Sequence, residues 1–235
     1  MLSQSPPVSD TLLGIGFYTA AEAARLLRLP ARAVNRWLGG YDAGTGEARR
    51  RHPPLWTPQL PPADGHLELG FRDMIELRFI AAFRKLGLPL PLIRRCIAVA
   101  RDMIQQDHPF STQRFKTDGR TIFLESMRAA GEERIIDLRN MQFSFRDVIA
   151  QTFKDLDIED DAVRRWRPYR NKASIVIDPQ RAFGQPIAAT AGVPTIVLAD
   201  AMKAEGSLAR VSRLYEVAPH VVMDAIAFEE TLRAA

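Results

Sequence analysis

Arg32, Asn35 and Arg36 are three side chains that can read DNA, and they lie three and four residues apart. On a helix this spacing places all three on one face. The opposite face would be apolar and would carry Val34, Trp37 and Leu38. Arginine pairs with guanine and asparagine with adenine through two hydrogen bonds each, and arginine also neutralises phosphates. The pattern predicts a helix that enters the major groove of DNA, with a plain helical hairpin and solvated arginines as the alternative.

A preceding helix would position these side chains. Thr19 and Glu22 have the spacing of a capping box, which predicts that a helix begins at Ala20. Its buried side would carry Ala23, Ala24 and Leu27. Pro30 breaks this helix and suits the first turn of the next one. The two helices form a predicted helix-turn-helix, and we expect Thr19 and Arg28, which flank the first helix, to contact DNA as well.

A glycine-rich segment with a basic end follows the predicted recognition helix. Residues 39–46 contain four glycines, and Arg49, Arg50 and Arg51 follow two residues later. Such a segment beside a helix-turn-helix predicts a wing, a small β-hairpin that lies along the phosphate backbone. The alternative is a loop with a solvated run of charges.

Positive and negative charges are concentrated in different segments of the chain, although its net charge is small. Residues 25–51 hold seven arginines against two acidic residues, residues 71–101 hold seven basic against two, and residues 102–161 hold thirteen acidic against eight basic. The whole chain of 235 residues carries a net charge of only +4. A basic first half suggests that DNA binds at one end and a different partner at the other. The simpler alternative is that the acidic loops only make a globular protein soluble.

No catalytic or metal-binding pattern emerges from the sequence. The four histidines are scattered, and the phosphate-binding, nucleophile-elbow and dinucleotide glycine motifs are absent. The single cysteine, Cys96, excludes an internal disulfide and lies between Ile93 and Ile97 on an apolar face, so we expect it to be buried. The acidic residues of 155–161 lack the glycine and final glutamate of a calcium loop. We therefore expect no enzyme, no cofactor and no metal, and no apolar run is long enough for a membrane span.

Residues 67–102 predict two further amphipathic helices that are separated near Gly87. Their runs Leu77-Arg78-Phe79-Ile80 and Leu92-Ile93-Arg94, together with YTAAEAARLL and VNRW upstream, resemble the MerR-type DNA-binding domain over roughly residues 17–104. This chain departs from that family in a long, proline-rich segment, 39–66. The long dimerising coiled coil that usually follows is interrupted here at residues 105–109.

The middle of the chain has mixed signals. Asp118-Gly119 lies between β-prone runs, which predicts a hairpin over residues 114–124. A short strand is expected at 135–138 and a helix at 144–156. Three residues near the end of this segment are candidates to bind a partner: Arg164, Trp166 and Arg167. The alternative, which we favour, is a seam between domains in which Trp166 is buried under arginines.

The C-terminal segment predicts a strand at 175–179 and then helices at 195–204, 207–217 and 219–232. Gly184, Pro186, Gly192, Val193 and Pro194, followed by Ala225, Ile226, Phe228 and Glu229, resemble domain-of-unknown-function family 433. That family is similar to Vap-type antitoxins. The apolar stripes of these helices indicate only that each helix buries one face, which would also suit a dimerisation module or a second helix-turn-helix. Tyr215 and Phe228 are candidates for contact with a partner.

Together the resemblances imply a mainly α protein with small β-hairpins. They imply a loose tail over 1–16, a MerR-like winged helix-turn-helix over 17–108, an α/β connection over 109–172 and an antitoxin-like helical domain over 173–235. The implied function is that of a cytoplasmic, homodimeric antitoxin that binds operator DNA, represses its own operon and neutralises a PIN-type ribonuclease toxin. A MerR-type regulator that responds to a small ligand and has no toxin partner is the alternative.

Overall fold

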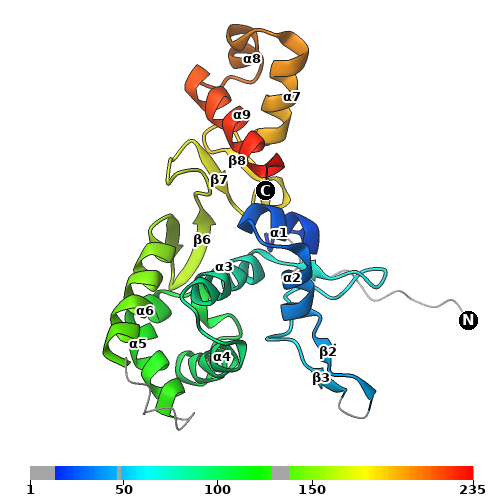
Figure 1. Cartoon of the computed structure of the whole chain (residues 1–235). Coiled ribbons are helices and arrows are strands. Elements are labelled where there is room, and N and C mark those ends of the chain that lie inside the picture. The colour runs from blue at the N-terminus through cyan, green and yellow to red at the C-terminus, as the bar shows by residue number, and fades with distance from the viewer. Residues whose placement is uncertain (1–13, 47–48, 129–137, 235) are drawn as a thin grey trace, which may run out of the picture.

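The computed structural model describes residues 14–46, 49–128 and 138–234. The fold is mainly helical with small β-hairpins, as the sequence predicts. Figure 1 shows an elongated molecule with a C-terminal helical unit at the top, a helical unit at the lower left and a long hairpin at the lower right. One hydrophobic core extends through the two helical units.

The N-terminal part contains two short helices and two small antiparallel pairs of strands. Its elements are β1 Tyr18–Thr19, α1 Ala20–Leu27, α2 Ala31–Leu38, β2 Tyr41–Ala43, β3 Arg50–His52 and β4 Glu68–Leu69. β1 pairs with β4, and β2 pairs with β3. The helix-turn-helix and the hairpin after it are thus where the sequence predicts them, with one difference: Leu26, rather than Leu27, is the buried leucine of α1.

Residues 14–16 belong to this folded part rather than to a loose tail. The backbone oxygen of Ile15 accepts a hydrogen bond from the Phe71 backbone nitrogen at 2.8 Å, and Gly16 is buried. The rest of the predicted tail, residues 1–13, lies outside the described residues.

Four longer helices and a short 3₁₀ turn form the helical unit at the lower left of Figure 1. They are α3 Phe71–Lys85, α4 Leu90–Ile104, η3 Pro109–Ser111, α5 Gln113–Arg128 and α6 Leu138–Phe153. Phenylalanine rings fill the space between them: the Phe79 ring lies 4.9 Å from that of Phe153, and the Phe145 ring stacks on Phe83 at 4.6 Å and on Phe123 at 4.4 Å. Aromatic packing therefore joins α5 and α6 to each other and to α3.

The predicted hairpin at 114–124 is wrong, because these residues lie inside α5. The buried positions Phe115, Gly119, Ile122, Phe123, Ser126 and Met127 recur at helical spacing. Packing of this face overrides the local turn preference of Asp118-Gly119. Gly119 also permits a close approach to α6, since a Cβ atom there would lie only 2.5 Å from Ile149 Cδ1.

The other predictions for the middle segment hold in part. The expected helix at 144–156 is present but begins earlier, as α6, and Leu156 already belongs to the first strand of the sheet. The expected strand at 135–138 falls mainly on residues 135–137, which lie outside the described residues, and Leu138 begins α6.

A four-stranded antiparallel sheet connects this unit to the C-terminal helices. Its strands are β5 Leu156–Glu159, β6 Ala162–Trp166, β7 Ile175–Ile177 and β8 Pro186–Ala188, with the turn η4 Ala182–Gly184 between the last two. The helices α7 Thr195–Glu205, α8 Leu208–Leu214 and α9 Pro219–Arg233 follow. The three predicted C-terminal helices are confirmed, with bounds that differ by a few residues.

Candidate nucleic-acid interface

The turn between α1 and α2 is fixed by local interactions at both ends of α1. At its start, Thr19 Oγ1 accepts a hydrogen bond from the Glu22 backbone nitrogen at 3.2 Å, and the Thr19 nitrogen donates to Glu22 Oε2 at 2.9 Å. The predicted capping box is therefore confirmed, and it occupies the Thr19 hydroxyl. At its end, Arg28 adopts a left-handed conformation with φ of 54° and is exposed. This residue reverses the chain so that α2 can cross α1.

Helix α2 has the two faces that the sequence predicts. Val34, Trp37 and Leu38 are buried in the core. Arg32, Asn35 and Arg36 are exposed on the other side. Asn35 Nδ2 donates to the Ala31 backbone oxygen at 3.2 Å, so this amide would have to rotate before it could pair with a base.

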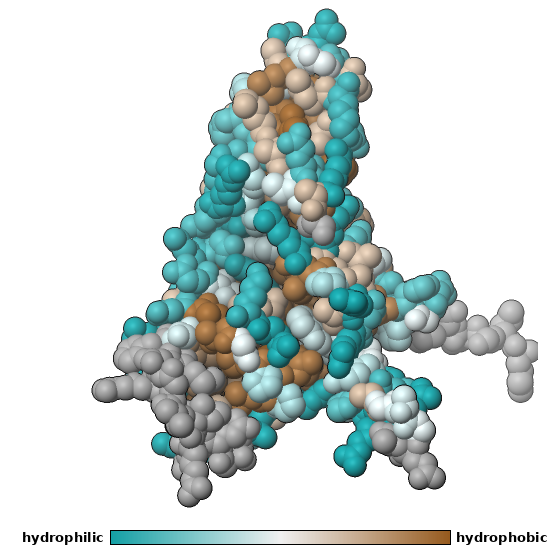
Figure 2. Space-filling model, in the orientation of Figure 1, coloured by the Kyte–Doolittle hydropathy of each residue, from teal (hydrophilic) through white to brown (hydrophobic). Residues whose placement is uncertain are grey.

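The hairpin of β2 and β3 carries the second group of predicted DNA contacts. Arg49, Arg50 and Arg51 are all exposed on it. Arg49 forms an ion pair with Asp42 at 2.7 Å, and Arg51 Nη2 donates to the Gly39 backbone oxygen at 2.9 Å. Figure 2 shows hydrophilic residues together with residues of intermediate hydropathy over the described part of this hairpin, at the lower right. Exposed arginines on an extended arm suit contact with phosphates.

An aromatic pair that the sequence reasoning missed joins α2 to the hairpin. Tyr41 lies opposite His52 in the register of the hairpin, and their rings stack with centroids 4.6 Å apart. The guanidinium carbon of Arg36 lies 3.7 Å from the centroid of the Tyr41 ring. The cation–π contact therefore links the exposed face of α2 to the hairpin. The sequence does not determine the register of the hairpin, so the grouping of Arg36, Tyr41 and His52 is visible only in the structure.

The base of the hairpin is held in place by two further features. Gly40, between α2 and β2, has φ of +71°, and a Cβ atom there would lie 2.7 Å from the His52 backbone oxygen, so this turn requires glycine. Arg94, on α4, donates to the backbone oxygens of Pro53 and Pro54 at 2.8 and 2.7 Å. Helix α4 thus fixes the segment that follows β3.

A buried carboxylate anchors the connection between the hairpin and α3. Asp73 accepts hydrogen bonds from Trp56 Nε1 at 2.7 Å and from the backbone nitrogens of Gln59 and Gly70 at 2.9 Å each, and His108 Nε2 lies 2.9 Å from it. These bonds satisfy the carboxylate inside the core. The proline-rich segment is consequently attached to the same helix that supports α1.

The residues predicted to bind a partner have different positions. Trp166 and Phe228 are only 5% and 2% exposed, so both rings belong to the core in this conformation. Trp166 Nε1 donates to Asp155 Oδ2 at 3.0 Å, which agrees with the seam that we favour for this tryptophan. Arg164 and Arg167 are half-buried and form ion pairs with Asp160 and Asp157, and Tyr215 is half-buried at the end of α8. Because both rings are buried, neither Trp166 nor Phe228 offers a surface to a partner in this conformation.

The described residues also bear on thiol chemistry, metal binding and membrane insertion. Cys96 is fully buried, and burial raises the pKa of its thiol to about 11, so it carries a neutral thiol. Across residues 14–46, 49–128 and 138–234, no three histidine, cysteine or acidic side chains gather closely enough to hold a metal ion. Within the same residues, no helix combines the length and apolar character of a membrane span.

Three comparisons relate this arrangement to known proteins. Residues 16–97 match the family described as "Putative DNA-binding HTH domain". The chain is 26% identical over 226 residues to the "Putative antitoxin VapB45" of Mycobacterium tuberculosis, which covers 90% of this chain and 93% of that protein. The crystal structure of Rv2018 from Mycobacterium tuberculosis has a TM-score of 0.69 and 24% identity, with 89% of this chain and 96% of that chain covered, and it shows that the fold is shared. The exposed α2 face thus lies within the residues that are similar to this helix-turn-helix family.

Proposed function

We propose that this chain is an antitoxin that binds operator DNA, represses its own operon and neutralises a PIN-type ribonuclease toxin. The observation that carries the proposal is the exposed Arg32–Asn35–Arg36 face of α2 beside a basic hairpin, within residues that match a DNA-binding family. The similarity to VapB45 over nine-tenths of the chain supports the antitoxin role. The MerR-like character of the front and the domain division 17–108, 109–172 and 173–235 belong to the same proposal.

DNA would be bound in two ways. The α2 face lies in the major groove, where Arg32 and Arg36 pair with guanine and Asn35 with adenine. The hairpin arginines Arg49, Arg50 and Arg51, with Arg28 at the turn, contact phosphates on either side. The Thr19 hydroxyl, engaged in its cap, contributes by holding the start of α1 in position.

A homodimer follows from the size of the recognition helix. With eight residues, α2 reaches only a few base pairs, which gives little specificity to a single copy. Two copies on half-sites about one helical turn of DNA apart would supply the rest. Sedimentation of the protein with and without such DNA tests this: a monomer in both states would contradict the dimer.

The best candidate surface for the toxin lies between β1 and the C-terminal unit. Phe183 is 77% exposed and Phe17 is 50% exposed, and both line a hollow of about 540 Å³ together with Ile196. Phe183 has φ of 53°, a conformation that bulky residues rarely adopt. An exposed ring in a strained turn is typical of a contact residue. Apolar helix or loop side chains of a small nuclease would fit this hollow.

The decisive experiment is purification of the tagged full chain from its native cells, followed by identification of co-purifying proteins and DNA. A stoichiometric small nuclease of the PIN type, together with DNA from upstream of the operon, supports the proposal. Phe183→Asn would retain the backbone conformation, which asparagine tolerates, and should release the nuclease. Met103→Gln, at another exposed apolar position on α4, is the matched control and should retain it. Recovery of the protein with DNA alone contradicts the toxin partner.

The second candidate function is a MerR-type regulator that responds to a small ligand and has no toxin partner. It is favoured by a polar cavity of about 490 Å³ between α3 and the sheet. Recovery of DNA without a nuclease, together with DNA binding that changes in the presence of a small molecule, would support this alternative.

A further inference from the structure

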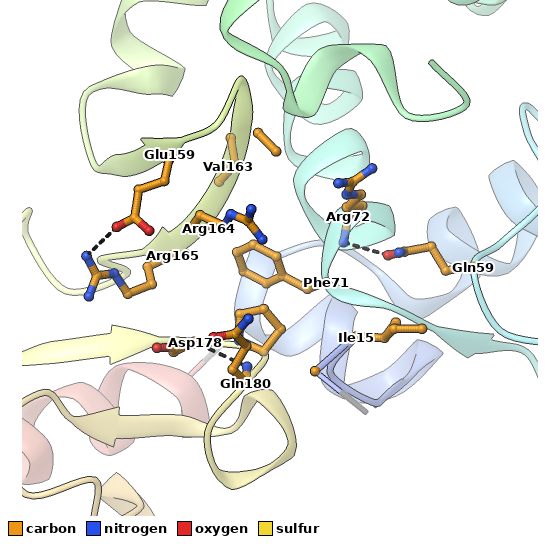
Figure 3. A pocket seen from close by; sticks show the side chains of 13 residues that line it. Ile15, Gln59, Phe71, Arg72, Glu159, Val163, Arg164, Arg165, Asp178 and Gln180 are labelled. Atoms are coloured by element: carbon orange, nitrogen blue, oxygen red, sulfur yellow. Dashed lines mark hydrogen bonds and ion pairs between the residues drawn. The ribbon is translucent and has the colours of Figure 1, made fainter. Parts of the chain in front are cut away.

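A cavity opens where three parts of the chain meet. Its walls come from the residues before β1, from the N-terminal end of α3 with the preceding loop, and from the sheet strands β5, β6 and the turn after β7 (Figure 3). Its volume of about 490 Å³ lies in the range of pockets that hold small molecules. The cavity is distinct from the α2 face and from the hollow lined by Phe17 and Phe183, which is formed by other residues.

Positively charged side chains are prominent in the lining of the cavity. Arg72, Arg164 and Arg165 all line the cavity, with Gln59 and Gln180 beside them. Figure 3 shows Arg72 on α3 and Arg164 reaching from β6 toward Phe71. Arginine guanidinium groups recognise carboxylate and phosphate groups with paired hydrogen bonds.

The acidic residues of the lining are already engaged. Glu159 lies 3.1 Å from Arg165 Nη2 in an ion pair, and Asp178 Oδ1 accepts a hydrogen bond from the Gln180 backbone nitrogen at 3.0 Å. Arg164 pairs at 3.3 Å with Asp160, whose side chain is 88% exposed and therefore screened by solvent. The lining therefore carries three arginines against two carboxylates, which leaves a net positive charge in the cavity.

Arg72 is the strongest sign of a missing anion. Among the described residues, its guanidinium has no ion pair and no hydrogen bond. It lies in the first turn of α3, where the partial positive charge of the helix end adds to its own charge. The Arg72 backbone nitrogen donates to Gln59 Oε1 at 2.8 Å, which orients the Gln59 amide and leaves its nitrogen free to donate.

We infer that this cavity binds a small organic anion, whose carboxylate or phosphate group is held by Arg72 and Arg164 with a hydrogen bond from Gln59. A second hollow shares Ile15, Gln59 and Arg72 with the first, so the remainder of the ligand has room on both sides of Arg72. Because the walls belong to both the DNA-binding part and the sheet, the bound anion would fix their relative position.

Titration calorimetry on the full chain in chloride buffer at constant ionic strength tests the inference, with inorganic phosphate and citrate as probes. Binding of phosphate alone indicates a phosphate ligand, and binding of citrate alone indicates a carboxylate. Arg72→Gln and Arg164→Gln should each weaken the binding about tenfold or more. Arg213→Gln removes the same charge from exposed α8 and should leave it unchanged. Arg72→Gln should fold normally, because its side chain has no partner to lose.

Two results would overturn the inference. One is that neither probe binds the wild-type protein at concentrations up to about 10 mM; the other is equal binding by wild type and both variants. DNA binding distinguishes the nearest alternative, a contact between Arg72 and a DNA phosphate. Arg72→Gln should bind operator DNA as the wild type does in chloride buffer. Reduced DNA affinity with no anion binding would assign Arg72 to DNA instead.

Discussion

The contact between Arg36 and Tyr41 determines how far this arginine can move on the exposed face of α2. A guanidinium 3.7 Å from the ring centroid is held toward the hairpin before any DNA arrives. An exposed cation–π contact contributes about 0.5–1 kcal/mol. We expect Tyr41→Leu to weaken operator binding by a similar amount, and Arg36→Ala by roughly 1–3 kcal/mol if it reads a base. Fluorescence anisotropy at fixed salt measures both.

The double variant with Tyr41→Leu and Arg36→Ala distinguishes an effect of Tyr41 on the orientation of Arg36 from a direct contact between Tyr41 and DNA. If Tyr41 acts through Arg36, then Tyr41→Leu should have almost no further effect once Arg36 is alanine. Fully additive losses would mean that Tyr41 touches DNA by itself. Arg210→Ala, on α8, is a charge control that should bind as the wild type does.

Glu76 links the stability of the protein to pH. Burial, with a smaller contribution from the Asp73 carboxylate, raises the pKa of Glu76 well above its usual range. The folded state therefore binds this proton more tightly than the unfolded state, and the associated stability is lost as pH rises through the folded pKa. Glu76→Gln keeps the oxygen that accepts from the Ser111 nitrogen at 3.0 Å and needs no proton.

The variant should consequently gain free energy of unfolding over the wild type by an amount that increases from pH 5 to pH 8. Urea unfolding at the two pH values measures this difference. Glu230→Gln, exposed on α9, is the control and should show no such trend. A difference between Glu76→Gln and wild type that is independent of pH would contradict a raised pKa of Glu76.

At the scale of elements, the packing of α5 against α6 can be tested at Gly119. Alanine is favoured over glycine within a helix by about 1 kcal/mol. Here its Cβ would lie 2.5 Å from Ile149 Cδ1, which must move. Gly119→Ala should therefore raise the free energy of unfolding by about 1 kcal/mol in an Ile149→Val background, which lacks Cδ1, and by less in the wild type. If Asp118-Gly119 instead formed a hairpin turn, Gly119→Ala would lower the free energy of unfolding in both backgrounds.

The elements that the sequence predicts well are those fixed by local signals. The capping box at Thr19 and the apolar stripes of α2 and α9 require no knowledge of the rest of the fold. The hairpin expected around Gly119 failed because a local turn preference lost to a buried helical face. The Tyr41–His52 stack and the cavity around Arg72 depend on register and on contacts between distant segments, for which a single sequence contains no signal.

At the scale of the whole molecule, two hydrogen bonds connect the DNA-binding part to the C-terminal part. The Phe17 backbone nitrogen donates to the Phe183 oxygen at 3.0 Å, and Tyr18 Oη donates to the Gly184 oxygen at 2.7 Å. Tyr18 is only 2% exposed, and burial raises the pKa of its hydroxyl, which therefore remains a donor. This junction borders the hollow proposed for the toxin, so a partner bound there would also stabilise the connection between the two parts.

Tyr18→Phe tests how strongly the two parts unfold together. The change removes the only donor that the Tyr18 side chain offers and leaves the buried Gly184 oxygen unpaired, which costs about 1–3 kcal/mol. Calorimetry should show a lower Tm and a broader or divided transition, because the lost bond joins residues 166 positions apart. Tyr215→Phe, at a half-buried tyrosine on the C-terminal unit, is the matched control. Operator binding at 25 °C should remain near wild type, since α2 is untouched; equal Tm values for the two variants would mean that the junction contributes little to cooperativity.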